Sequence, residues 1–407
     1  MRCDRVKTFQ LIFQPMKFST QLVDQIQSAI QSDRLVDTAV QLIAVPSPTR
    51  NARDVADRLA KILREDGFDV ERLEADWPQS PAVVAHLRSG QAGQTLQFNG
   101  HLDTVHLPFV PPRVSGGKLY GSGASDMKGG LAAAIEAMRV LRDTEMLGGG
   151  EVLLTAADLH EAPWGDARQL RALIEAGYVG DGVLIPEYLA DRLPVMGRGM
   201  AILEVRITRD GVPVHEVIGG LEEPRVITAG AELIERFEEL DQQLSHLTHH
   251  LGDRESVFIG QVSSGEIYNQ SPTEFTLSGT RRWLPGADVA LVQQQFQEVL
   301  DAVGLRQGIV VNGQFNFLCD AFELDPGCSL LDKFQSAYQA ATGQTLPLGS
   351  KPFGDDGNTF SSLTGVPAIT HGPNGQGAHT VDEVVPVSEL ERVALVYALT
   401  AVCFCEG

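Results

Sequence analysis

The chain has 407 residues, of which 43% are hydrophobic and 21% charged, and its 53 acidic and 32 basic side chains give a formal net charge of −21. A chain of this length is expected to fold as two domains, and the composition is ordinary for a globular protein. Because Lys and Arg form no cluster, we expect no nucleic-acid partner, and because no apolar stretch approaches ~18 residues, we expect no membrane association.

Residues 1–15 carry basic side chains before a short apolar patch, an arrangement that superficially imitates a secretion signal. Gln10, Gln14 and Pro15 interrupt the patch, and no small-residue cleavage site follows it. We therefore interpret these residues as either a start-site extension or a disordered lead. The cysteines are odd in number and lack finger-type or redox-type spacing, which predicts reduced thiols and a cytoplasmic location. They are Cys3, Cys319, Cys328, Cys403 and Cys405.

The first half of the chain alternates predicted helices with short apolar strands. Helices are expected over 20–44 and 52–66, the second ending at Gly67, and an Ala- and Met-rich helix is expected over 129–143. Strands are expected at 69–75, 82–87, 95–100 and 151–158. This alternation predicts an α/β layered domain whose functional residues follow the strand ends.

The pattern changes near residue 197, where a different unit begins. Residues 201–208 alternate apolar and polar side chains, which is typical of a sheet with one face toward solvent. We therefore predict a catalytic domain formed by 16–195 and 310–407, interrupted by an inserted α+β domain at 196–309. The other elements expected around the insertion are a helix beginning near Pro224, a strand over 275–283, a helix over 287–303 and a strand over 308–316.

Clusters of polar side chains follow or interrupt the predicted strands. Taken singly they are weak indications, because a lone His after a strand is more often a satisfied polar residue and an Asp before a helix is more often a cap. Taken together, they follow the strand ends of one α/β domain, where such sheets place their sites. Imidazole with carboxylate suits zinc, and carboxylates also suit cobalt or manganese. The clusters supply His101, Asp103, Asp126, Asp158, His160, Glu161, Glu187, His371, His379, Asp382 and Glu383.

Two segments carry a specific resemblance: GHLDTV at 100–105 and SDMKGG at 125–130. With VPSPT at 45–49 and AHTVDE at 378–383, they occur in the order typical of one family. Over nearly its whole length the chain resembles the dizinc peptidase and deacylase family that includes acetylornithine deacetylase, succinyl-diaminopimelate desuccinylase and bacterial glutamate carboxypeptidase. The resemblance implies a zinc-exopeptidase-like, three-layer α/β catalytic domain with an inserted α+β lid domain that mediates formation of a homodimer.

The same resemblance implies the metal ligands. His101, Asp126 and Glu187 would hold one ion. Asp126, Glu161 and His379 would hold the other, with the Asp126 carboxylate bridging the pair. Three carboxylates and two neutral imidazoles facing two dications leave one net positive charge, which a bridging hydroxide would neutralise. Such a hydroxide is the nucleophile that metal coordination makes available near neutral pH.

Three residues of the inserted domain match substrate-contacting positions of the family. His215 is implied to reach a neighbouring subunit's active site and stabilise an oxyanion, and a surface histidine in a turn is the alternative. Asn269 and Arg282 are implied to contact substrate, with Arg282 gripping a carboxylate through its two-pronged guanidinium. A solvent-facing arginine is the alternative there, and the adjacent Arg281 leaves the assignment ambiguous.

His160 departs from the family pattern, which has two adjacent glutamates where this chain reads His160-Glu161. The first of those glutamates is a general base, and histidine can also carry protons near neutrality. Three interpretations of His160 remain: a general base, an additional metal ligand, or a sign of lost activity. Asp103 is implied to orient His101 and to select its tautomer.

The functional hypothesis is a metallo-amidohydrolase that uses two divalent metal ions, zinc before cobalt or manganese. Its substrate would be a small N-acyl amino acid or short peptide bearing a free carboxylate. A dipeptidase or carboxypeptidase on the same scaffold is the alternative among enzymes. Outside the enzymes, the alternative is a non-catalytic metal- or ligand-binding homologue, which only the histidine at position 160 favours.

Overall fold

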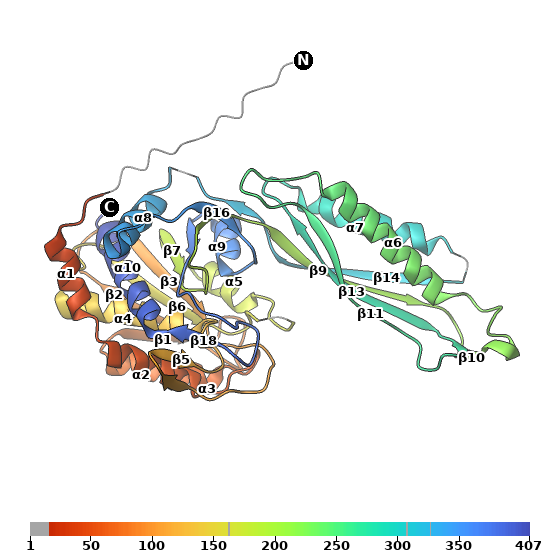
Figure 1. Ribbon diagram of the computed structural model, residues 1–407, viewed down its shortest axis with the longest axis horizontal. Coiled ribbons are helices and arrows are strands. Elements are labelled where there is room, and N and C mark those ends of the chain that lie inside the picture. The colour runs from red at the N-terminus through yellow and green to blue at the C-terminus, as the bar shows by residue number, and fades with distance from the viewer. Residues whose placement is uncertain (1–15, 162, 307, 326) are drawn as a thin grey trace, which may run out of the picture. The chain divides into compact units, whose positions relative to one another are not determined.

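The computed structural model describes residues 16–161, 163–306, 308–325 and 327–407, which divide into two units (Figure 1). Unit 1 contains the chain up to Val195, together with Leu324–Leu348 and Thr364–Gly407. Unit 2 contains Met196–Glu323 and Gly349–Leu363. The interpretation of residues 1–15, including the thiol of Cys3, lies outside the described residues.

The end of the inserted unit differs from the predicted boundary at 309/310. β14 (Val310–Cys319) belongs to unit 2 because it pairs with β9 (Gly199–Thr208) from one end to the other. The stretch 349–363, which holds most of α9 (Asp356–Thr364), also belongs to unit 2. Strand pairing, and not order along the chain, decides to which unit a segment belongs.

Unit 1 is built on a six-stranded mixed sheet. Its strands, in spatial order, are β1 (Asp69–Leu73), β2 (Ala82–Arg88), β6 (Glu151–Ala157), β3 (Thr95–His101), β7 (Gly182–Ile185) and β17 (Ala368–Thr370). β3 is parallel to both β6 and β7, and β17 is parallel to β7, whereas β2 is antiparallel to both its neighbours. Two helices, α4 (Lys128–Thr144) and α10 (Val387–Cys405), pack against β3, and α3 (Arg53–Glu65) packs against β1 and β2. The predicted α/β class is confirmed.

The helix predicted over 20–44 is two helices, α1 (Thr20–Ala29) and α2 (Ser32–Ile43). Ile30 and Gln31 between them are extended. The N–H of Gln31 donates to the Glu136 carboxylate on α4 at 2.9 Å, so a long-range acceptor replaces the helical one. Apolar spacing alone could not reveal this break, because the periodicity continues across it.

Unit 2 contains a four-stranded antiparallel sheet covered by two helices that also contact each other, α6 (Val226–Leu244) and α7 (Val289–Gly304). Leu203, Val205 and Ile207 of β9 are buried in the core, whereas Glu204 and Arg206 are exposed, as the alternation predicted. The strands, in spatial order, are β11 (Ser256–Ser264), β13 (Glu274–Trp283), β9 and β14.

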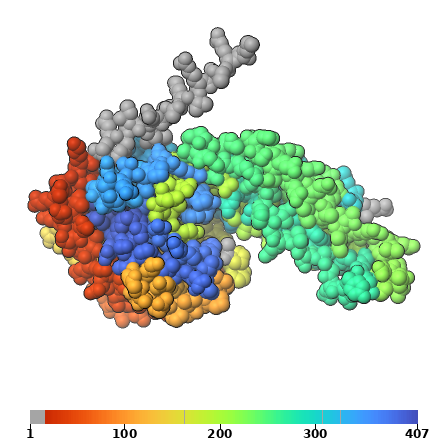
Figure 2. Space-filling model, in the orientation of Figure 1, coloured from red at the N-terminus to blue at the C-terminus, as the bar shows by residue number. Residues whose placement is uncertain are grey.

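On the face of unit 1 seen in Figure 2, the N-terminal helices (red) border C-terminal segments (blue), and α10 contacts both α1 and α2. Among the described residues, no helix is both long and apolar enough to cross a membrane. The remaining elements are α5 (Arg168–Glu175), α8 (Ser329–Thr342), β4 (Arg113–Ser115), β5 (Lys118–Tyr120), β8 (Leu193–Gly197), β10 (Val214–His215), β12 (Gln270–Ser271), β15 (Phe322–Glu323), β16 (Leu348–Lys351), β18 (Val384–Pro386) and the 3-10 helix Glu216–Ile218.

Candidate metal site

The candidate site lies at the carboxyl edge of three neighbouring parallel strands of unit 1. His101 is the last residue of β3, and Glu161 and Glu187 follow β6 and β7. Because adjacent parallel strands end at the same edge of a sheet, these side chains meet there. Asp126 reaches the same place from the loop that precedes α4, and His379 from the segment before β18.

The structure groups the five predicted metal ligands into two sets that share Asp126. His101 Nε2 lies 3.1 Å from Asp126 Oδ1 and 3.4 Å from Glu187 Oε1. His379 Nε2 lies 3.3 Å from the other oxygen, Asp126 Oδ2, and 3.2 Å from Glu161 Oε2. The two oxygens of one carboxylate thus face two different imidazoles.

The hydrogen bonding of His101 requires a positive charge in the first set. Its Nδ1 lies 2.9 Å from the backbone carbonyl of Asp103, an acceptor, so Nδ1 carries the hydrogen. In the neutral ring, Nε2 then directs a lone pair at oxygens of Asp126 and Glu187, which is repulsive unless a cation or proton intervenes. Burial alone lowers the pKa of His101, but Asp126 and Glu187 raise it well above its ordinary value.

Glu187 shows the same need for a cation. Its Oε2 is buried and has no hydrogen-bond partner among the described residues. Burial and the neighbouring Asp126 carboxylate raise the pKa of Glu187 to about 8. Asp126 and Glu187 are both at most 5% exposed, so water cannot screen their repulsion.

The donor atoms of both sets fit divalent ions. In a tetrahedral zinc site with bonds of about 2.0–2.1 Å, neighbouring donor atoms are about 3.3 Å apart. The four imidazole–carboxylate separations above range from 3.1 to 3.4 Å. Imidazole nitrogen with carboxylate oxygen is also the donor chemistry that zinc prefers.

Asp103 orients the site through its main chain as well as its side chain. The resemblance implied that Asp103 orients His101 and selects its tautomer. The Asp103 carbonyl accepts the hydrogen of His101 Nδ1, whereas the Asp103 carboxylate lies 3.7 Å from that nitrogen. The carboxylate accepts the backbone N–H groups of His160 at 3.1 Å and Glu161 at 2.9 Å. Leu159, with φ of 72°, turns the chain so that both groups point at Asp103.

The Asp126 loop is held by Glu383, to which the sequence assigned no role. The Glu383 carboxylate accepts the backbone N–H groups of Gly123, Ser125 and Asp126, each at 3.0 Å. Burial raises the pKa of Glu383 to about 7, while these bonds oppose the shift. In the sequence, Glu383 was indicated only by its place in the polar cluster that contains His379.

Glycines bring α4 close to two of the ligand-bearing segments. A Cβ on Gly130 would lie 2.0 Å from the carbonyl oxygen of Pro186, the residue before Glu187. A Cβ on Gly129 would lie 2.3 Å from the carbonyl oxygen of Ala124, in the Asp126 loop. Neither residue has a positive φ, so close approach is the reason for glycine at both positions.

Not every polar residue singled out in the sequence joins the two sets. His371 is buried with its ring edge-on to Phe334 and Tyr338, and burial lowers its pKa to about 3. The Asp158 carboxylate accepts the backbone N–H groups of Arg50 and Ala52, so it supports a loop. Asp382 is exposed.

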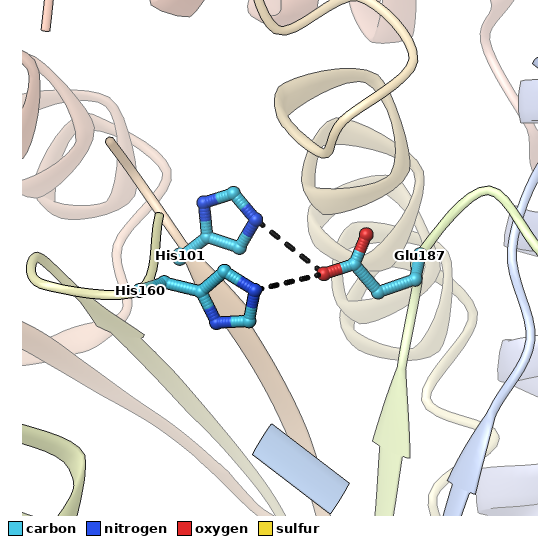
Figure 3. Close-up of side chains that lie close together, drawn as sticks. All are labelled: His101, His160 and Glu187. Carbon is cyan, nitrogen blue, oxygen red and sulfur yellow. Dashed lines mark ion pairs between the residues drawn. The ribbon is translucent and has the colours of Figure 1, made fainter. Parts of the chain in front are cut away.

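His160 lies beside His101 and Glu187, two members of the first set (Figure 3). Its Nε2 is 3.7 Å from Glu187 Oε1, the same oxygen that faces His101. The two imidazole rings are stacked, with centroids 4.0 Å apart and planes inclined by 4°. Donor atoms of His101, His160 and Glu187 all lie within 4.8 Å of one another.

The three predicted substrate-contacting residues belong to unit 2. His215 Nε2 lies 2.9 Å from Asn269 Nδ2, so these two form a pair. Arg281 is 2% exposed and pairs with Glu255, which assigns it a structural role. The Arg282 guanidinium, by contrast, has no hydrogen bond or ion pair within the described part of the chain, and burial and the nearby Arg198 lower its pKa.

Comparison with known proteins agrees with the sequence resemblance. Residues 97–402 match the profile of "Peptidase family M20/M25/M40". A succinyl-diaminopimelate desuccinylase of Gluconacetobacter diazotrophicus is 28% identical over 395 residues, covering 88% of this chain and 94% of that protein.

Solved structures share the fold. Aminopeptidase PepT of Bacillus cereus superimposes with a TM-score of 0.74 at 20% identity, covering 92% of this chain and 99% of its own. The YXEP protein of Bacillus subtilis, described as a dinuclear metal-binding peptidase of the M20 family, gives a TM-score of 0.65 at 17% identity, covering 92% and 98%. The expected scaffold is therefore confirmed.

Proposed function

The chain belongs to peptidase family M20/M25/M40, and from this membership we propose a two-metal enzyme that hydrolyses the amide bond of a small N-acyl amino acid bearing a free carboxylate. Membership makes the chain a metal-dependent hydrolase of amide bonds. One observation supports the two-metal proposal above all others: two imidazole–carboxylate sets share the two oxygens of Asp126.

In this proposal His101, Asp126 and Glu187 hold one divalent cation. Asp126, Glu161 and His379 hold the other. Zinc is the proposed metal because imidazole and carboxylate suit it, and cobalt or manganese would also fit. Bound divalent cations would supply Lewis acidity, which lowers the pKa of water and polarises an amide carbonyl. The chain's own contribution is positioning: Asp103 orients His101 and the backbone at 160–161, and Glu383 holds the Asp126 loop.

The proposed group that recognises a substrate carboxylate is Arg282. It is partly buried and forms no ion pair within the described ranges, although the charge of Asp253 acts on it from nearby, whereas Arg281 next to it is paired with Glu255. A partly buried guanidinium that no carboxylate binds directly can still accept an anionic ligand.

An Arg282→Ala variant is expected to raise KM for a carboxylate-bearing substrate about 10- to 100-fold, because a charge-assisted hydrogen bond contributes roughly 1.5–3 kcal/mol. Steady-state kinetics on a substrate and its carboxamide analogue would measure this. The carboxamide should be a poor substrate for the wild type, and Arg282→Ala should not lower activity on it further. Arg206→Ala, which removes an exposed arginine of the same unit, is the matched control. An equal loss on both substrates would contradict carboxylate recognition.

His215 and Asn269 are proposed to stabilise the developing oxyanion from unit 2 of a second copy. The support for a homodimer is the sheet edge of unit 2: β11 is an edge strand, and its Phe258 and Val262 are exposed. Exposed apolar side chains on an edge strand favour association.

Mixing two inactive proteins would test this arrangement. Asp126→Ala and His215→Ala homodimers should exchange subunits and regain activity, since a hybrid contains one intact metal site facing one intact His215. Sedimentation would follow the dimer, and hydrolysis the recovery. No recovery despite proven exchange would show that His215 does not act across subunits.

A substrate panel distinguishes deacylase from peptidase. The relative quoted above is named for removing a succinyl group from succinyl-diaminopimelate, so N-succinyl and N-acetyl amino acids should be cleaved faster than dipeptides by zinc-loaded enzyme. Faster cleavage of dipeptides would favour the dipeptidase or carboxypeptidase alternative. If the wild type is inactive and gains hydrolysis on His160→Glu substitution, the result would favour a non-catalytic metal- or ligand-binding protein.

A further inference from the structure

We propose that His160 is a metal ligand, a second imidazole on the ion that His101 and Glu187 hold. This rests on the two-metal function proposed above. The family pattern has a proton-carrying glutamate at this position, so the histidine would otherwise be interpreted as its replacement. The structure favours a different role, because Nε2 of His160 faces Glu187, itself one of the proposed ligands (Figure 3).

The backbone at His160 is held in place by hydrogen bonds within the chain. Asp103 accepts the N–H groups of His160 and of Glu161, and Leu159 adopts a left-handed conformation just before them. Two neighbouring residues held by one carboxylate aim their side chains with little freedom. Because Glu161 is a proposed ligand of the second ion, the same carboxylate positions both side chains.

The distances place both imidazoles beside one carboxylate oxygen. Glu187 Oε1 lies 3.4 Å from His101 Nε2 and 3.7 Å from His160 Nε2. Neighbouring donors of a tetrahedral zinc ion are about 3.3 Å apart, so to share the ion His160 Nε2 has to move about 0.4 Å closer to Glu187 and its ring has to tilt out of the parallel stack with His101. The stacked rings direct both Nε2 atoms toward the same carboxylate oxygen.

The charge of the site is consistent with a neutral fourth donor on this ion. Asp126, Glu161 and Glu187 already crowd three carboxylates into a buried space. A histidine at position 160 adds a donor without adding a negative charge, so two bound dications stay more electrophilic than they would beside a fourth carboxylate. A ligating Nε2 has its lone pair occupied. His160 therefore does not act as the general base that carries a proton during hydrolysis.

Co²⁺ substitution tests the proposal without relying on activity. Proton NMR of the Co²⁺-loaded protein reports a hyperfine-shifted, solvent-exchangeable N–H for each imidazole bound to the metal. One such resonance of the wild type should be absent from His160→Ala. The Co²⁺ affinity should also fall at least ~10-fold, since even groups that only support a ligand contribute 10–100-fold. His106→Ala, which removes an exposed histidine next to Trp164, should change neither reading.

The outcomes separate this proposal from the function on which it rests. If wild type binds two Co²⁺ ions but His160→Ala keeps every shifted resonance and the same affinity, His160 is not a ligand. If wild type does not bind two ions, the two-metal function fails first. Should His160→Ala not fold, X-ray absorption of wild type alone decides: three imidazoles for two ions support the proposal, and two overturn it.

Discussion

An Asp126→Ala variant is expected to lose both metal ions together and more than ~10³-fold in kcat/KM, because even a residue that supports a metal ligand contributes 10–100-fold. The reason is that Asp126 faces His101 with one oxygen and His379 with the other, so one substitution removes a donor from each set. The remaining donors would bind each ion independently and weakly. Metal analysis after dialysis and hydrolysis of the best panel substrate would measure both effects.

The control for this experiment is Asp382→Ala. Asp382 is exposed and lies three residues beyond His379, so the variant removes a nearby carboxylate without touching either set. It should retain two ions per chain and wild-type activity. A variant of Asp126 that keeps both ions and full turnover would show that the ligand assignment is wrong.

A Gly130→Ala variant is expected to lose about 3 kcal/mol of unfolding free energy and to bind metal more weakly, because overpacking a core costs this much when the neighbours cannot move. The added Cβ would lie 2.0 Å from the Pro186 carbonyl oxygen, which is backbone and cannot rotate away. Relief requires α4 to withdraw from the segment that carries Glu187. Urea unfolding and zinc titration would measure the two losses.

Gly304→Ala is the matched control. Gly304 ends α7, and a Cβ there would meet nothing closer than 4.0 Å, from the Val311 side chain. Alanine has the higher helix propensity, so stability should stay the same or rise slightly. Equal behaviour of the two variants would mean that the approach of α4 to Pro186 is looser than the structure shows.

Much of the scaffold follows from residue pattern. The alternation in 201–208 identified the buried face of β9, and the Ala- and Met-rich run identified α4, because burial imposes periods of two and 3.6 residues on any sequence. The break between α1 and α2 did not follow, since the acceptor for Gln31 lies on α4. The assignment of β14 to unit 2 depends likewise on its pairing with β9.

For the site, too, some features could be predicted from the sequence and others could not. The resemblance to the family was enough to propose His101, Asp126, Glu161, Glu187 and His379 as ligands. The roles of their neighbours were not accessible, because each depends on where a distant backbone group points. Glu383 supports a loop 260 positions earlier, and Arg281 and Arg282, though adjacent, differ in partner because alternate residues of a strand face opposite sides.

By itself, the sequence determined the family, the α/β class and the chemistry of the proposed donors, since these follow from residue identity and spacing. Only the tertiary structure decided that Asp103 orients His101 through its carbonyl and that His160 faces Glu187. The physical reason is that a hydrogen bond or a coordination sphere depends on atomic positions within a few tenths of an ångström. Such positions arise when β3, β6, β7 and the Asp126 loop converge, and no single segment encodes them.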